Sequence, residues 1–233
     1  MAIISERKTK RFAKHHLFAL ILCILSILVF SLILWMVVSE NKILFLDFLI
    51  NQSVSAFHGE IITWVMIFFT NIISPFVFAF LLIVLLFVFV YMKKFYSAVL
   101  LFFSILAGFL SGLLIKFLVY RLRPANVLIE FSGSSFPSGH ATMAVIFFSL
   151  VIYSFKYEIK NKFARYLFIV CSILLFLIIG FSRIYLNVHW FSDVIAGFFL
   201  GIFWLTLLIL LFKIVNLDKI IDKKFKETIQ AQD

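Results

Sequence analysis

The sequence predicts an all-α fold: a six-transmembrane-helix bundle with an interfacial helical segment between the first and second spans. The chain is 64% hydrophobic, with a mean hydropathy of +1.17 and 33 phenylalanines in 233 residues. This is more apolar surface than a soluble core of that size can bury. Several apolar runs also reach the roughly 20 residues that a helix needs to cross a bilayer. We therefore expect one integral-membrane domain, residues 1–233.

The expected spans follow the apolar runs in order. They are residues 17–38, about 72–92, 97–120, 138–155, 166–184 and 192–212. The first run is too long for a signal-peptide core and lacks a small-residue cleavage site, so it should remain as an anchor. Residues 43–60 mix polar and apolar side chains and should lie along the membrane interface, with 61–73 dipping in before a span that starts near Pro75.

The basic residues sort by the side of the membrane. Sixteen of the 21 fall in the tails 1–16 and 213–233 and in the turns after the second and fourth spans. With six acidic residues on that side, it carries the whole net charge of +10. The positive-inside rule then predicts a multi-pass cell-membrane protein with both termini cytoplasmic. The basic excess thus indicates topology, and no nucleic-acid partner is expected.

The polar clusters all lie on the opposite, extracytoplasmic side. The first is "KFLVYRLRP", residues 116–124, at the end of the third span. On a helix, Lys116 and Arg123 share one face, which favours a paired anion clamp, whereas Arg121 turns off that face and should meet lipid headgroups. Pro124 should end the helix. Snorkelling of long basic side chains to water is the alternative explanation for this cluster.

The second cluster is "FPSGHATMA", residues 136–144, which opens the fourth span. Ser138 and Gly139 after a proline are typical of a helix N-terminus, where unpaired backbone N–H groups can hold an anion. His140 is placed at the same point. A histidine at a span end can be purely structural, but the anion-binding surroundings favour a functional one.

The third cluster is "SRIYLNVHWFSD", residues 182–193, between the last two spans. If it is helical, the i, i+4 spacing puts His189 and Asp193 on one face. A carboxylate that holds Nδ1–H leaves Nε2 free, the arrangement of an activated nucleophile. An ion pair joining two helix ends is the alternative. Two histidines and a carboxylate could also bind a metal, but Lys116, Arg123 and Arg183 would repel a cation and attract a phosphate. We favour metal-free phosphoryl transfer without a cofactor.

The three clusters, K-x6-R-P, P-S-G-H and S-R-x5-H-x3-D, resemble the signature of the type 2 phosphatidic acid phosphatase family in residue types and order. The resemblance spans a catalytic core of about 97–212 and implies a six-helix core. It implies that His189 attacks phosphorus with support from Asp193, and that His140 protonates the leaving oxygen and later activates water. The phosphate-binding residues would be Lys116, Arg123, Ser138, Gly139 and Arg183.

The expected function is hydrolysis of a lipid phosphate, such as phosphatidylglycerophosphate, phosphatidic acid or undecaprenyl diphosphate, through a phosphohistidine. The sequence separates neither monophosphate from diphosphate substrates nor one oligomeric state from another. A transporter or scramblase is the main alternative, because charges at membrane depth also mark permeation paths. A vanadate-dependent haloperoxidase, a related class that is usually soluble, is a weaker alternative.

Overall fold

A computed structural model describes residues 2–39 and 42–215, with side chains for 17–39 and 45–215. The regular structure in this part of the chain is entirely helical, which confirms the all-α prediction. The helices are α1 (Ala2–Ser39), α2 (Lys42–Ser55), α3 (Glu60–Asn71), α4 (Pro75–Tyr91), α5 (Phe95–Val119), α6 (Gly139–Phe155), α7 (Lys162–Tyr185) and α8 (Phe191–Ile214). The predicted C-terminal tail from 216 onward lies outside the described residues.

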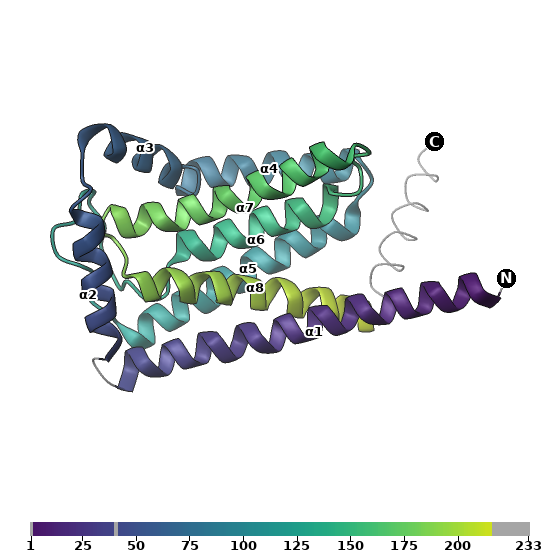
Figure 1. The fold of residues 1–233 in the computed structure, drawn as a ribbon, viewed down its shortest axis with the longest axis horizontal. Helices are drawn as coiled ribbons and strands as arrows, with labels where there is room; N and C mark the ends of the chain where they lie inside the picture. Colours follow the sequence, from purple (N-terminus) through teal and green to yellow (C-terminus); the bar gives the residue numbers. More distant parts are fainter. Residues whose placement is uncertain (1, 40–41, 216–233) are drawn as a thin grey trace.

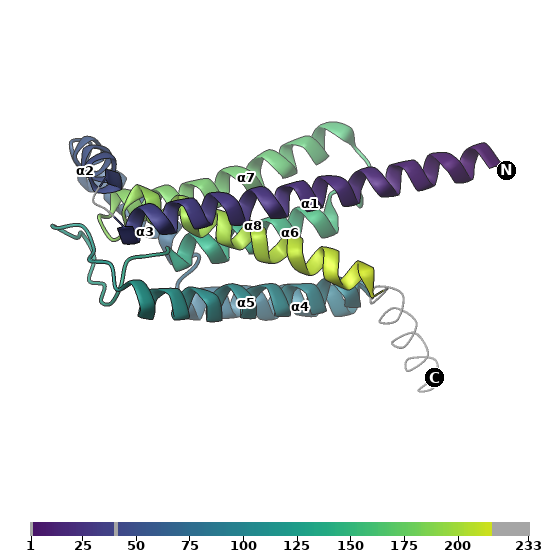
Figure 2. The same ribbon diagram turned by 90° about the horizontal axis from the view of Figure 1, so that it is seen from below.

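α1 and the helices α4 to α8 run along one axis, and α2 lies across one end of them (Figure 1). α1 packs along α8, and α6 lies between α5, α7 and α8 (Figure 2). The α6 side chains from Ala141 to Phe148 are all buried. α6 is therefore the central helix of the bundle, and its N-terminus is positioned by three neighbours.

Close backbone contact fixes α8 against α6. A Cβ atom added to Gly197 would lie 2.6 Å from the Ser138 carbonyl oxygen, and one added to Gly201 would lie 2.8 Å from the Thr142 carbonyl oxygen. Only glycine fits at such distances, and small residues allow helix backbones to approach in membranes. The N-terminal ends of α6 and α8 are thus held side by side.

Among the described residues, four helices are long and apolar enough to cross a membrane: α1 from Leu17, α5, α7 and α8. α3 and α4 pass the same criterion as a pair bent by 48°, which would make a fifth span. The apolar α6 has 17 residues and is shorter than the criterion requires. The predicted count of six therefore stays a prediction, although each predicted span coincides with a helix.

The segment between the first two expected spans is helical, but it is broken twice. α2 lies across the end of the bundle, as expected of a segment at the interface. α3 ends at Asn71, and α4 starts at Pro75. Proline is tolerated at the first position of a helix because the N–H of that residue forms no hydrogen bond within the helix. This proline explains why residues 61–92 do not form one straight helix.

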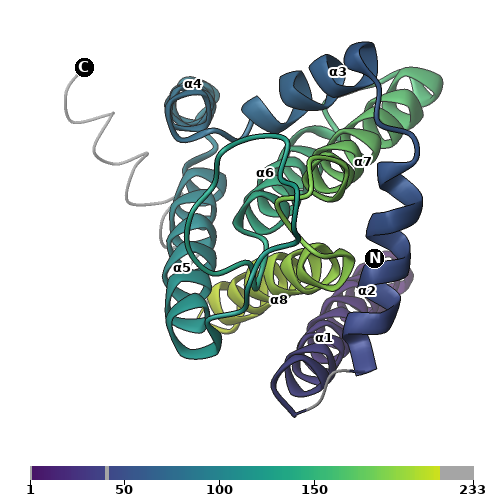
Figure 3. The same cartoon turned by 90° about the vertical axis from the view of Figure 1, so that its left-hand side faces the viewer.

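The two ends of the bundle differ in chemistry. At one end, Lys94 on the turn between α4 and α5 donates to the Ser154 carbonyl at 2.8 Å and to Glu158 at 2.6 Å, which joins this turn to the one after α6. The opposite end collects the C-termini of α5 and α7, the N-termini of α6 and α8, and the segment 120–138, which lies over α6 (Figure 3). The three sequence clusters all fall at this second end.

Candidate active site

The second and third clusters meet where α6 and α8 begin. Ser138 caps α6, and its backbone N–H donates to the Asp193 carbonyl at 3.0 Å. Ser138 is fully buried, and its hydroxyl accepts from the Ala141 N–H at 3.5 Å. The Ser138 N–H is thus already used, which leaves the next N–H groups of α6, at Gly139 and His140, as the unpaired donors expected of a helix start.

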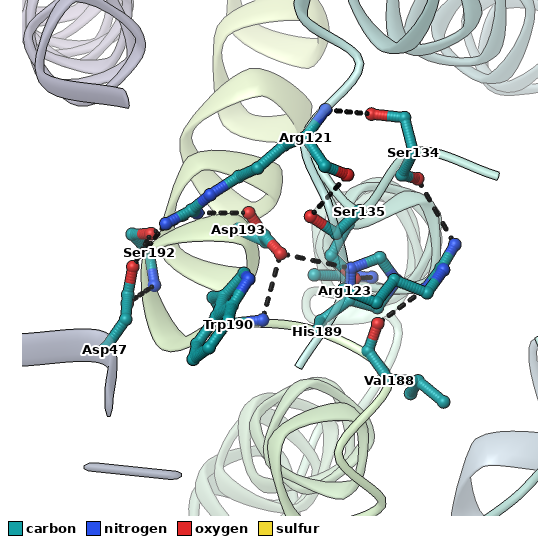
Figure 4. A network of polar contacts seen from close by, with 12 residues as sticks. Asp47, Arg121, Arg123, Ser134, Ser135, Val188, His189, Trp190, Ser192 and Asp193 are labelled. Carbon is teal, nitrogen blue, oxygen red and sulfur yellow. Dashed lines mark hydrogen bonds and ion pairs between the residues drawn. The ribbon is translucent and has the colours of Figure 1, made fainter. Parts of the chain in front are cut away.

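His189 and Asp193 are in contact, but not through a helical turn. α8 begins at Phe191, so His189 lies in the preceding turn, and the helical condition under which the two residues would share a face is not met. The Asp193 Oδ2 atom accepts from the Trp190 N–H at 2.9 Å and lies 3.5 Å from His189 Nδ1 (Figure 4). At that separation the two side chains are in contact, but they do not form a hydrogen bond of good geometry. This contact still leaves Nε2 pointing away from the carboxylate.

The His189 imidazole is held in its neutral form. Its side chain is 2% exposed, and burial together with the charges of Arg183, Lys116 and Arg123 lowers the pKa of His189 well below its usual value near 6.5. The same three cations act on His140. Both imidazoles therefore belong to one electrostatic environment, and neutral His189 has a lone pair on one ring nitrogen.

Lys116 and Arg123 come together, but by a different route from the one predicted. α5 ends at Val119, because Tyr120 adopts a left-handed conformation with φ 44°. The Tyr120 N–H donates to the Lys116 carbonyl in the last helical hydrogen bond. Arg123 is therefore not on a helix, and its shared face with Lys116 is a wrong prediction. Both side chains instead donate to the Ser134 carbonyl, Lys116 at 2.7 Å and Arg123 at 3.2 Å.

The predicted contact of Arg121 with lipid headgroups is wrong. The Arg121 side chain is only 8% exposed and lies away from the lipid-facing surface. It donates to Asp193 Oδ1 and to Asp47 Oδ2, both at 2.6 Å. The predicted headgroup contact assumed that α5 continues past residue 120. Because the chain leaves the helix at Tyr120, the helical spacing between Lys116 and Arg121 does not predict the direction of the Arg121 side chain.

Arg183 has N–H groups that donate no hydrogen bond to the described residues. Its side chain is 1% exposed and donates through Nη1 to Thr70 at 2.6 Å, whereas its Nε and Nη2 groups have no partner among the described residues. The guanidinium groups of Arg123 and Arg183 each lie 4.7 Å from the ring centroid of Phe131. The His140 ring meets the same phenylalanine edge-on, with centroids 6.0 Å apart. Phe131 thus gathers three of the predicted site residues.

Asp47, Thr70 and Phe131 contact the candidate site residues but were not predicted from the sequence. Asp47 is a carboxylate in the apolar stretch 43–50, and such isolated charges at membrane depth are a signal that could have been followed. Thr70 and Phe131 carry no comparable signal, because hydroxyls are common in spans and Phe131 is one of 33 phenylalanines.

An apolar groove of about 310 Å³ opens between α4, α5 and α6 and ends at the cluster. Its walls are aliphatic and aromatic side chains with the bare backbones of Gly108 and Gly112. Its polar lining consists of Lys116, Gly139, His140 and Thr142, all on α5 and α6. An alkyl chain could lie in this groove with its head among the cations.

The charge balance of the cluster favours an anion. Lys116, Arg121, Arg123 and Arg183 face the carboxylates of Asp47 and Asp193, so four positive charges oppose two negative ones. Within the described residues, no three histidine, cysteine or carboxylate side chains gather as a metal site would need. Fixed cations with unused N–H groups are suited to phosphate oxygens.

Comparison with known proteins places this arrangement in a family. One relative is phosphatidylglycerophosphatase B of Bacillus subtilis (strain 168), 32% identical over 112 residues, which are 47% of this chain and 51% of that protein. The matched part thus spans about half the length of that curated relative.

Two crystal structures share the fold. The first transmembrane PAP2 type phosphatidylglycerolphosphate phosphatase from Bacillus subtilis matches with a TM-score of 0.70 and 20% identity, over 82% of this chain and 93% of that one. Aquifex aeolicus LpxE matches with a TM-score of 0.59 and 23% identity, over 70% and 94%. The family model of the PAP2 superfamily matches residues 96–216, just over half of the chain, and that region includes every predicted site residue from Lys116 to Asp193. This protein therefore belongs to the PAP2 superfamily.

Proposed function

We propose that the protein is a metal-independent lipid phosphatase that hydrolyses a lipid phosphomonoester or diphosphate through a phosphohistidine. The observation that carries the proposal is Arg183, whose buried Nε and Nη2 groups lack partners among the described residues and whose charge acts on His140, a residue that lines the apolar groove. A buried donor without a partner is costly, and a phosphate oxygen removes that cost. The groove suits the hydrocarbon chain of the same molecule.

The chemistry follows from the two imidazoles. The Nε2 lone pair of neutral His189 attacks phosphorus while the bond from phosphorus to the leaving oxygen breaks. His140, which the negative charge of the bound phosphate brings to its protonated form, donates its proton to that oxygen. In the second step His140 takes a proton from water, the water oxygen bonds to phosphorus, and the bond to Nε2 breaks. The cations stabilise the charge that spreads over the equatorial oxygens.

Lys116 and Arg123 hold the carbonyl groups of 132–135 in this structure. Their contribution to binding requires that phosphate oxygens compete with, or share, these donors. Arg183 needs no such exchange. We therefore place Arg183 first among the phosphate-binding residues, with the Gly139 and His140 N–H groups beside it.

The location of the charged groups favours an enzyme over a transporter. In the described helices α5 to α8, each Lys, Arg, His, Asp or Glu side chain lies within about one turn of a helix end. A permeation path would require polar groups at several depths.

The test is phosphate release from long-chain phosphatidylglycerophosphate, phosphatidic acid and undecaprenyl diphosphate by purified protein in detergent. We expect release from at least one of these lipids that persists in EDTA and is inhibited by vanadate, a tetrahedral anion that can mimic the transferred phosphoryl group. Release that needs an added divalent metal, or none from any of the three, would contradict the proposal. The relative rates identify the preferred headgroup.

A groove variant in the same assay tests the lipid chain. A Cβ added to Gly112 meets nothing within 4 Å, so Gly112→Phe places a ring in the open groove. It should raise KM for the long-chain lipid about tenfold or more, because several methylene contacts are lost, and leave KM for a short-chain ester unchanged. Leu110→Phe, on the exposed face of α5, is the matched control. An equal change in KM for the long-chain and the short-chain substrate would mean that the groove does not bind the lipid chain.

We further propose six crossings, with both termini cytoplasmic and the site extracytoplasmic. The basic turns 92–94 and 156–161 lie at the end of the bundle opposite the site, as the positive-inside rule requires. In intact cells, a membrane-impermeant maleimide should label a cysteine introduced at Gly133 and spare one introduced at Lys160, both in a variant without Cys23 and Cys171. Labelling with the opposite preference would reverse the orientation.

A further inference from the structure

A buried chain of charges connects α2 to the carboxylate beside His189. Arg121 lies between Asp47 on α2 and Asp193 on α8, and its Nη2 and Nη1 atoms donate to the two carboxylates at 2.6 Å each (Figure 4). The Asp47 and Asp193 side chains are 1% and 0% exposed. Neither carboxylate could stay charged at such burial without a partner.

Asp47 also fixes the start of α8. Its Oδ1 accepts from the Ser192 N–H at 2.9 Å, and its Oδ2 accepts from the Ser192 hydroxyl at 2.7 Å. The Ser192 hydroxyl accepts in turn from Arg121 at 2.8 Å. A carboxylate at a helix N-terminus is favoured by the unpaired N–H groups there. The residue before Asp193 is therefore held through both its backbone and its side chain.

The two oxygens of Asp193 have separate tasks. Oδ1 is occupied by Arg121, whereas Oδ2 accepts from the Trp190 N–H and faces His189 Nδ1. Because Oδ1 is fixed, the carboxylate cannot rotate freely, and Oδ2 stays directed at the imidazole. Arg121 also supplies the positive charge that stabilises Asp193 as an anion in this buried position.

We propose that Asp47, on α2, and Arg121, which follows α5, are positioning residues that keep the Asp193 carboxylate ionised and aimed at His189. The inference rests on the proposed phosphatase function and goes beyond it, because the catalytic step then depends on a helix outside the region 96–216 that the family match covers. A purely structural network would anchor α2 without changing the rate of the chemical step.

Two conservative variants test the inference. Asp47→Asn keeps an acceptor for the Ser192 N–H but loses the charge that faces Arg121. Arg121→Lys keeps a charge but lacks the fork that reaches both carboxylates. Each should lower kcat by about 10- to 100-fold, the usual effect of losing a partner that orients a reactive group, with little change in KM. The double variant should have a kcat no lower than that of the slower single variant, because each substitution already disrupts the same network of Asp47, Arg121 and Asp193.

Asn51→Ala is the matched control for anchoring α2. Asn51 lies on the same helix, is buried and donates to Asn187 at 3.1 Å, without contacting Asp193. It should lower the melting temperature in detergent as the two positioning variants do but leave kcat within about threefold of the wild type. The inference fails if Asp47→Asn and Arg121→Lys retain the wild-type kcat, or if Asn51→Ala lowers kcat equally. A wild-type protein that releases no phosphate overturns the proposed function itself.

Discussion

His189→Ala is expected to abolish phosphate release, with kcat lowered by about 10⁴-fold or more, the scale of losing a covalent nucleophile. The variant is expected to unfold at a lower temperature than the wild type but to remain folded at the assay temperature, because loss of this fully buried side chain leaves a cavity. Phosphate release at saturating lipid phosphate, with thermal unfolding measured in parallel, checks both statements.

His140→Ala should behave differently from His189→Ala, because the two imidazoles have different roles. With an aryl phosphate, whose leaving group departs without protonation, the first step should persist in His140→Ala. The second step still needs a base to activate water, so an acid-labile phosphohistidine should accumulate. His189→Ala should give neither product nor phosphoenzyme with either substrate. A phosphoenzyme that forms in His189→Ala would assign the nucleophile to another residue.

His58→Ala provides the matched histidine control. His58 lies at the same end of the bundle, but its Nε2 atom contacts the Tyr185 carbonyl at 2.8 Å and its ring packs on Tyr185 with centroids 4.8 Å apart. These contacts fix the chain between α2 and α3 against α7, as expected of a structural histidine. A kcat within about threefold of the wild type is expected, the effect of a modest local perturbation. A loss as large as that in His189→Ala would mean that the assay reports general damage at this end.

The helices could be predicted from the sequence because their signal is strong and local. A bilayer requires long apolar helices, and α4 to α8 begin and end close to the predicted span limits. α1 ends close to its predicted limit but begins at Ala2, well before the predicted start at residue 17. The bend between α3 and α4 was also marked locally, by Pro75. The sequence did not indicate that α6 lies at the centre of the bundle. That position depends on which helices pack together, and apolar side chains alone do not reveal it because they face both lipid and protein.

The clustering of the candidate site residues was predictable from the sequence, but their geometry was less so. Lys116, Arg123, His140, Arg183, His189 and Asp193 lie in one cluster, as three motifs at one end of the spans indicate. The errors came from extending helical geometry past helix ends, at Tyr120 and before Phe191. Asp47 could be placed beside Asp193 only once α2 was known to cross the end of the bundle. Such contacts depend on tertiary structure, which no spacing along the chain encodes.

Arg183→Lys is expected to lower kcat/KM by about 10²- to 10³-fold, the effect of removing one set of fixed donors from a developing anion. The substitution keeps a positive charge on α7, so a loss of this size would come from the geometry of the donors. A lysine ammonium is a point charge and cannot replace the guanidinium N–H groups that are unpaired among the described residues while also bonding Thr70. Vanadate inhibition should weaken in parallel, because vanadate uses the same donors as the transferred phosphoryl group.

Arg165→Lys is the matched control, because Arg165 lies on the same helix at the opposite end of the bundle. It makes the same exchange of guanidinium for ammonium and should change neither kinetic constant nor vanadate inhibition. If Arg183→Lys keeps the wild-type kcat/KM, the buried guanidinium serves the fold through Thr70 and Phe131, and phosphate binding must then depend on Lys116 and Arg123. Those two residues would have to release the Ser134 carbonyl, so the segment 132–135 would move whenever substrate binds.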